Sequence, residues 1–220
     1  MYYPIFLDVR GRRCLVFGGN PGAARKAGYL KDCGADVMLY SPEEDTLPEL
    51  ADLAAQDRIA WARRGYRPGD LKGAWVAIVA DTSDLEVNLA IANEAKERNV
   101  LLNVMDVTHQ CTFIAPAVIH RAETTVAIST GGGSPALARR LRERMSDTDY
   151  CQCLRWAELG PMLRDVRGEV RGRALPVTPE DWATSITDEI LRLHEAGDRD
   201  GARSMLVSAL EARAGIRAGE

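Results

Sequence analysis

The stretch Arg13-Cys-Leu-Val-Phe-Gly-Gly-Asn-Pro-Gly-Ala-Ala-Arg-Lys26 decides the fold of this 220-residue chain. Its apolar start predicts a buried strand over residues 13–17, and a Gly-rich turn and a helix over 21–33 follow. This order is typical of a dinucleotide-binding loop, whose pattern is G-x-G-x-x-G/A. Gly18 and Ala23 occupy the first and last positions, but Asn20 stands where the second glycine is expected. The pattern therefore predicts a nucleotide-binding fold and leaves the binding itself open.

Strands and helices alternate over the first half of the chain. The residues that read as further strands are 37–40, 59–62, 75–80 and 100–105, and those that read as helices are 47–56 and 85–98. The continuous apolar run over 75–80 is expected of a strand that is covered on both faces. Such alternation is typical of a parallel, doubly wound α/β sheet of the Rossmann type. We therefore expect a Rossmann domain over residues 1–112.

The pattern changes after Asp106. Residues 113–119 and 124–128 read as two neighbouring strands, and Ser134-Pro135 begins a helix, with Ser134 as its N-cap. From Tyr150 the sequence reads as helix throughout, with a helix start at Thr178 and a last helix from Arg199 after a break at Gly197. These signals predict a small α+β segment over 113–148 and a helical region over 149–220.

Composition and charge exclude several classes of protein. The net charge of -4 gives no overall basic field for nucleic acid. No run approaches the roughly 20 apolar residues of a membrane helix, and the first residues lack a basic and then apolar secretory pattern. The five cysteines are an odd number without a C-x-x-C pair, which argues against a disulfide framework or a zinc site. We therefore expect a cytoplasmic protein without a metal site.

Several stretches, in order, resemble the precorrin-2 dehydrogenase family, the N-terminal modules of siroheme synthases. The resemblance covers about residues 1–145, and no single piece decides it. The matching stretches are Pro4-Ile-Phe-Leu-Asp8, Gly18-Gly19 with Ala23 and Arg25-Lys26, 75–88, Asn103-Val-Met-Asp106, Phe113-Ile-Ala-Pro116, and Ile128-Ser-Thr-Gly-Gly-Gly-Ser-Pro-Ala-Leu-Ala-Arg139. The combination is specific, whereas residues beyond 150 match only in their helical pattern.

The resemblance implies an oxidoreductase of siroheme biosynthesis. Family members oxidise the tetrapyrrole precorrin-2 to sirohydrochlorin, and a hydride passes to NAD. Some members also insert iron or cobalt into the product. A small segment, here 113–148, exchanges between subunits, so a homodimer is expected.

The cofactor residues are expected around the Gly-rich turn, where a helix N-terminus favours anions. The Asn20 side chain takes space that glycine leaves open, and Pro21 removes one N–H donor. Because no Arg or Lys follows the second strand, the cofactor is expected to be NAD rather than NADP. The expected cofactor contacts are Gly18, Gly19, Asn20, Pro21, Gly22, Ala23, Ser41, Pro42, Glu43 and Asp81.

The resemblance assigns acid/base catalysis to Asp106, at the end of the last strand of the sheet. A carboxylate facing a cleft can take a proton; the plainer interpretation is that Asp106 caps the following turn. The expected substrate contacts are Asn103, His109, Thr130, Gly131 and Arg139. The Gly-rich turn at 129–134 can instead be a hinge of the dimer segment.

Two other functions stay open at this point. Asn20 and Pro21 favour a metal chelatase that inserts iron or cobalt into sirohydrochlorin and whose NAD site is vestigial. A non-catalytic module that binds a tetrapyrrole is the other alternative.

Overall fold

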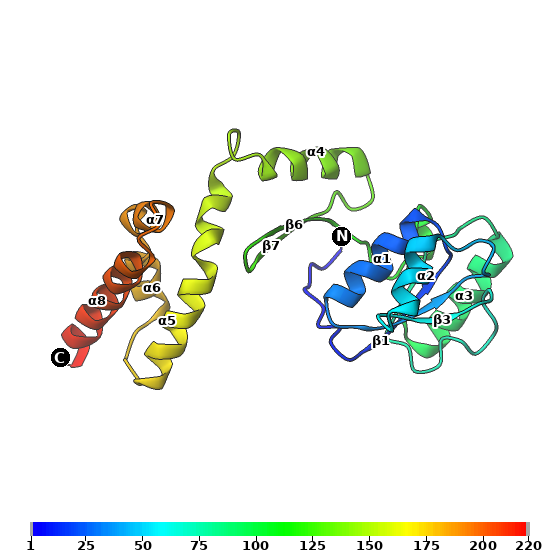
Figure 1. Ribbon diagram of the computed structural model, residues 1–220, viewed down its shortest axis with the longest axis horizontal. Helices are drawn as coiled ribbons and strands as arrows, with labels where there is room; N and C mark the ends of the chain where they lie inside the picture. Colours follow the sequence, from blue (N-terminus) through cyan, green and yellow to red (C-terminus); the bar gives the residue numbers. More distant parts are fainter. Residues whose placement is uncertain (1, 219–220) are drawn as a thin grey trace. The chain divides into compact units, whose positions relative to one another are not determined.

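The computed structural model describes residues 2–218 and divides the chain into two units (Figure 1). Unit 1 comprises residues 1–115 with 131–133, and unit 2 comprises 116–130 with 134–220. The predicted boundary at residue 148, between the small α+β segment and the helical region, stays a prediction. Within the described residues, no helix has both the length and the apolar character needed to cross a membrane.

Unit 1 is built on a five-stranded parallel sheet with the order β3-β2-β1-β4-β5. Its strands are β1 (Arg13–Phe17), β2 (Asp36–Tyr40), β3 (Ala60–Ala62), β4 (Val76–Val79) and β5 (Leu101–Val104). The chain leaves β1 toward β2 and β3 and then returns to place β4 on the other side of β1. This confirms the predicted doubly wound α/β fold.

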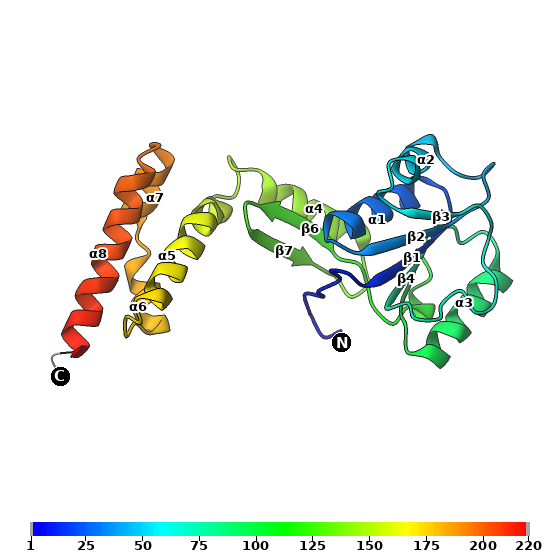
Figure 2. The same ribbon diagram turned by 60° about the horizontal axis from the view of Figure 1, so that its bottom comes forward.

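Helices cover both faces of this sheet (Figure 2). On one side lie α1 (Pro21–Asp32) and α2 (Pro48–Ala55), and on the other lies α3 (Leu85–Arg98). Successive residues of a strand point to opposite faces, so Val16 packs with the α1 and α2 core while Leu15 and Phe17 pack with the α3 core. Four of the five β1 residues are buried, as the apolar run predicted.

Unit 2 begins with an antiparallel hairpin of β6 (Ala117–Arg121) and β7 (Thr124–Ile128), followed by α4 (Pro135–Ser146). The predicted strand from Phe113 starts four residues late. The Thr112 and Phe113 N–H groups donate to the Leu102 carbonyl of β5, at 2.8 and 3.4 Å, which holds these residues in unit 1. Pro116 then lacks an N–H for a strand ladder.

The rest of unit 2 is helical, as predicted. It contains a short 3₁₀ helix η2 (Cys153–Leu159), then α5 (Gly160–Gly172), α6 (Pro179–Ser185), α7 (Asp188–Glu195) and α8 (Arg199–Ala218). The predicted start at Thr178 is a capping box with Asp181, and Gly197 separates the last two helices in a left-handed conformation. Fully buried leucines, among them Leu159, Leu206 and Leu210, form the core of this helical part.

Candidate functional site

A pocket of about 490 Å³ opens at the carboxyl ends of the central strands of unit 1. Three loops line it: Asn20 to Gly22 with Arg25 after β1, 80–83 after β4, and Met105 with Asp106 after β5. β1 and β4 are the neighbours at which the strand order reverses. Open parallel sheets bind ligands in the crevice at this switch point.

Two glycines let the surrounding loops approach β1. Gly18 has a φ of +114°, and a Cβ there would lie 2.7 Å from the Asp81 Cβ. A Cβ on Gly19 would lie 2.2 Å from the Asp45 carbonyl oxygen. The Leu47 N–H also donates to the Gly19 carbonyl at 3.0 Å, so the loop after β2 closes directly over Gly19.

The Asn20 side chain is turned into the protein. Its Nδ2 donates to the Ala80 carbonyl at 2.8 Å, and its Oδ1 accepts the Ala23 N–H at 2.9 Å. Asn20 is therefore both the N-cap of α1 and a bridge between the loops after β1 and β4. The space that a second glycine would leave open is filled by this amide.

The capping leaves few donors at the start of α1. Pro21 has no N–H, and Asn20 engages that of Ala23, so Gly22 alone of these three offers a donor. Over residues 2–218, neither the Gly22 N–H nor the exposed Arg25 side chain has a hydrogen-bond or ion-pair partner. One free N–H, one free guanidinium and a helix N-terminus fit a pyrophosphate, with fewer donors than a G-x-G-x-x-G loop provides.

Asp106 is exposed in the turn after β5. In this turn the Val107 N–H donates to the Val104 carbonyl at 3.2 Å. The φ of +62° at Asp106 is left-handed, a conformation that Asp tolerates better than most residues and that often marks functional sites. Among the side chains of residues 2–215 and the backbone of 2–218, no donor is bonded to its carboxylate, so the structure does not show a turn-capping role. The carboxylate lines the same pocket as Gly22 and Arg25.

Other residues expected at the site have different surroundings. Ser41, Pro42 and Glu43 lie in the loop over Gly19 and do not line the pocket; the exposed Glu43 pairs with Arg63 at 3.3 Å. The buried amide of Asn103 donates to the Phe113 carbonyl at 3.2 Å and so holds the loop after β5. The Asp81 carboxylate lines the pocket and accepts the Ser83 N–H at 3.1 Å.

The expected substrate contacts are divided between the units. His109 is exposed in the 3₁₀ helix η1 (Thr108–Gln110), and Gly131 belongs to unit 1 with a φ of +66°. Thr130 belongs to unit 2, where its hydroxyl donates to the Ser134 carbonyl and accepts the Ser134 N–H, both at 3.0 Å. Arg139 is exposed on α4, and its hydrogen bond to Glu143 raises the pKa of its guanidinium. Their contact with a substrate stays a prediction.

Sequence reasoning missed some pocket residues. Arg25 belongs to a stretch that resembles the family, but the sequence alone gives it no role. The signal that could have found the others is their place directly after a buried strand, where open sheets bind ligands. They are Ala80, Thr82, Ser83 and Met105.

Comparison with known proteins gives matches along almost the whole chain. Residues 5–117 match the family model described as "Putative NAD(P)-binding", and residues 125–148 match "Sirohaem biosynthesis protein central". The siroheme synthase of Methylobacillus flagellatus is 44% identical over 142 residues, which are 64% of this chain and 30% of that protein. The siroheme synthase of Chromobacterium violaceum is 36% identical over 220 residues, which are 99% of this chain and 46% of that protein.

The chain thus spans less than half the length of these curated relatives. Among solved structures it is similar to "SirC, precorrin-2 dehydrogenase", with a TM-score of 0.74 and 24% identity over 96% of this chain and 100% of that one. This likeness shows the fold. Because the first family model alone covers more than half of the chain, the chain belongs to the family described as "Putative NAD(P)-binding", and a segment that matches the central part of sirohaem biosynthesis proteins follows in order.

Proposed function

We propose that this chain oxidises precorrin-2 to sirohydrochlorin with NAD, as a cytoplasmic enzyme of siroheme biosynthesis. The observation that carries the proposal is that one pocket at the switch point of the sheet gathers the start of α1, Arg25 and the Asp106 carboxylate, and that neither side chain has a partner among the described side chains. A cation and a helix N-terminus suit a pyrophosphate, while a carboxylate beside them suits proton transfer.

The reaction removes two hydrogens from the macrocycle, one as a hydride and one as a proton. NAD, when bound, supplies the hydride acceptor. The Gly22 N–H and Arg25 hold the pyrophosphate, and Gly18 and Gly19 let the loops close around the turn. Asp106 takes the proton at a carboxylate oxygen that no other described group engages. Asn103, His109, Thr130, Gly131 and Arg139 are the proposed substrate contacts, still to be tested.

The direct test mixes the purified chain with NAD and precorrin-2. Equal amounts of NADH and sirohydrochlorin, followed by absorbance, are expected. The proposed dehydrogenase activity would be refuted if neither product appeared in a preparation that calorimetry shows to bind NAD.

Replacing Asn20 by glycine is expected to tighten NAD binding about tenfold. The change frees the Ala23 N–H and clears the amide from the pocket, and a hydrogen bond to a charged phosphate is worth roughly 1.5–3 kcal/mol. The loss of the bond to Ala80 costs about 1 kcal/mol of stability. Calorimetric titration and thermal melts measure the two effects.

Asn20→Ser is the matched control for this variant. Serine keeps a capping oxygen for the Ala23 N–H, so the NAD dissociation constant is expected to stay near the wild-type value. If Asn20→Gly bound NAD no more tightly than Asn20→Ser, the capped N–H would not be what limits binding.

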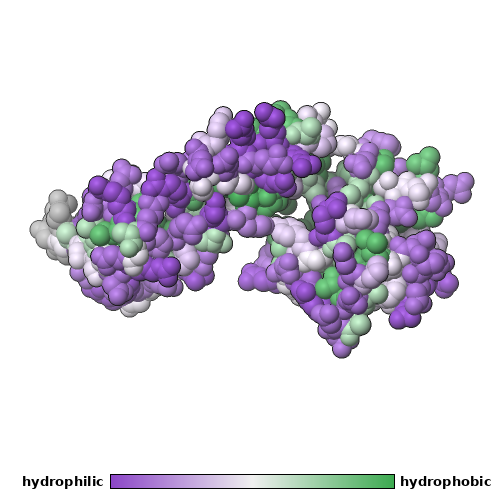
Figure 3. All heavy atoms as spheres, turned by 45° about the horizontal axis from the view of Figure 1, so that its top comes forward, coloured by the Kyte–Doolittle hydropathy of each residue, from purple (hydrophilic) through white to green (hydrophobic). Residues whose placement is uncertain are grey.

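We also propose that the chain forms a homodimer through residues 113–148. The hairpin of β6 and β7 has only two strands, and such a hairpin is marginally stable without further packing. On α4, Leu137 and Leu141 lie four residues apart and are 49% and 41% exposed. Figure 3 shows hydrophilic side chains over much of the visible surface, with hydrophobic side chains gathered in small groups among them. A second copy would cover these leucines.

Leu141→Asp is expected to weaken self-association about tenfold, because a leucine buried in an interface contributes roughly 1.5–3 kcal/mol. Analytical ultracentrifugation over a concentration series measures the change. Leu89→Asp, at a leucine 51% exposed on α3 of unit 1, is the control and should leave association unchanged. An equal effect of both changes would place the interface elsewhere.

A metal chelatase is the second candidate function. The observation that favours it is the small number of free N–H groups at the start of α1, where Pro21 has none and Asn20 engages that of Ala23. Sirohydrochlorin and cobalt ions, followed by absorbance, separate the two candidates. Metal insertion without any requirement for NAD, in a preparation that produces no NADH from precorrin-2, would favour the chelatase.

A further inference from the structure

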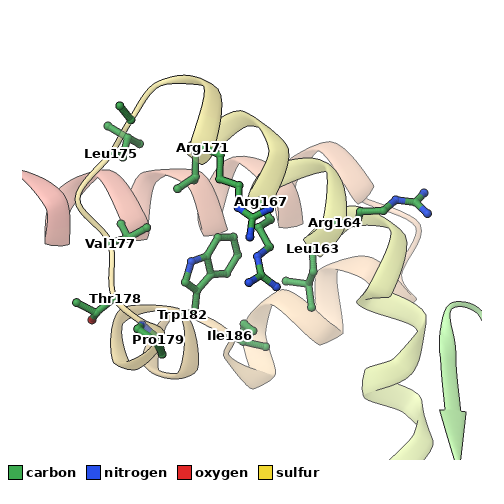
Figure 4. A pocket seen from close by; sticks show the side chains of 12 residues that line it. Leu163, Arg164, Arg167, Arg171, Leu175, Val177, Thr178, Pro179, Trp182 and Ile186 are labelled. Carbon is green, nitrogen blue, oxygen red and sulfur yellow. The ribbon is translucent and has the colours of Figure 1, made fainter. Parts of the chain in front are cut away.

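Unit 2 contains a larger pocket, of about 680 Å³, between α5, the loop after it and α6 (Figure 4). Eight of its twelve lining residues are apolar, and they include Leu163, Val177, Trp182 and Ile186. The Trp182 ring is half-buried and is the one aromatic side chain in this lining. The lining therefore offers an apolar surface that suits a flat ring.

The charged residues of the pocket are all cationic. Arg164, Arg167 and Arg171 line it, and no acidic residue does. Arg164 is paired with Glu123 and in Figure 4 points away from Trp182. Arg167 and Arg171 extend toward the side of the pocket that Trp182 occupies, and over residues 2–218 neither has an ion-pair or hydrogen-bond partner.

Of the nine arginines over residues 149–215, six have a hydrogen-bond or ion-pair partner, and only Arg167, Arg171 and Arg199 have none among the described residues. There, Arg155 pairs with Glu195, Arg173 with Glu169 and Glu211, and Arg203 with Glu169. Arg167 and Arg171 lie four residues apart on one helix, an arrangement in which like charges repel. An anion bound between them would remove this repulsion.

We propose that this pocket binds a planar aromatic dicarboxylate. Two carboxylates that leave the same edge of a ring can each be bound by one of two guanidiniums on the same face of a helix. Trp182 and the aliphatic residues pack against the ring itself. The site lies wholly within unit 2 and goes beyond the proposed dehydrogenase function, which uses the pocket of unit 1.

The test uses naphthalene-2,7-dicarboxylate, whose two carboxylates leave the same edge of the ring, in calorimetric titrations of the full chain. 2-Naphthoate, with one carboxylate, is expected to bind more weakly. Arg167→Gln and Arg171→Gln should each weaken binding of the dicarboxylate about fivefold, as expected for partly exposed ion pairs. Both positions are exposed and glutamine favours helix, so both variants should fold.

Arg199→Gln is the matched control, since Arg199 is an exposed arginine on α8 that does not line the pocket. Its affinity for the dicarboxylate should equal that of the wild type. The proposal is overturned if the wild type shows no binding at millimolar dicarboxylate. It is also overturned if 2-naphthoate binds equally well, or if all three variants bind alike.

Discussion

Gly19→Ala is expected to destabilise unit 1 by about 3 kcal/mol, at the upper end of what overpacking usually costs. A Cβ at this position would lie 2.2 Å from the Asp45 carbonyl oxygen and 2.6 Å from both the Ser41 Oγ and the Thr46 Cα. Two of these atoms are backbone and cannot rotate away. The loop after β2 would have to leave Gly19, and the hydrogen bond from the Leu47 N–H would be lost with it.

Thermal unfolding of the full chain, followed by calorimetry, measures the effect. A fall of roughly 10 °C or more is expected in the transition of unit 1. Gly28→Ala is the control. Gly28 lies inside α1 and a Cβ there would meet nothing within 4 Å, so alanine should add about 0.5–1 kcal/mol of stability. A Gly19→Ala variant that melts like the wild type would show that the loop does not pack on Gly19.

The sequence could predict the fold because its signals are local. Buried strands such as β1 and β4 appear as short apolar runs, and helix boundaries appear as single residues such as Ser134, Thr178 and Gly197. Each of these features depends on neighbours a few residues away. The misplaced start of β6 is the exception, because distant hydrogen bonds to Leu102 hold Thr112 and Phe113.

The candidate site depends on contacts that no local pattern contains. The sequence suggested that Asn20 would obstruct the turn, but its amide bridges to Ala80, sixty residues away, and caps α1. Asn103 looked available to a substrate, and its amide is bonded to the loop at Phe113. Such pairings decide which polar side chains are engaged in hydrogen bonds within the fold and which stay available to a ligand. The resemblance alone predicted Asp106, whereas Arg25 is singled out only once the fold is known.

Asp106→Asn is expected to lower kcat for the proposed oxidation of precorrin-2 by at least about 100-fold, the lower range for loss of a general acid or base. The amide has the shape of the carboxylate but cannot accept the proton. Asn also tolerates the left-handed backbone at this position, so the turn after β5 should keep its form. Steady-state rates of NADH formation give kcat, and calorimetry should find the NAD dissociation constant within about twofold of the wild type.

Asp81→Asn separates catalysis from a general effect of charge in the pocket. Asp81 also lines the pocket, but its carboxylate already accepts the Ser83 N–H, whereas the Asp106 carboxylate has no partner within residues 2–218. Removing the Asp81 charge should therefore change kcat by less than about threefold. A similar loss of kcat in both variants would indicate that the negative charge of the pocket, rather than proton transfer to Asp106, supports the reaction. An Asp106→Asn enzyme with near-normal kcat would move the acid/base role to another group, and exposed His109 in the adjoining 3₁₀ helix would be the next to vary.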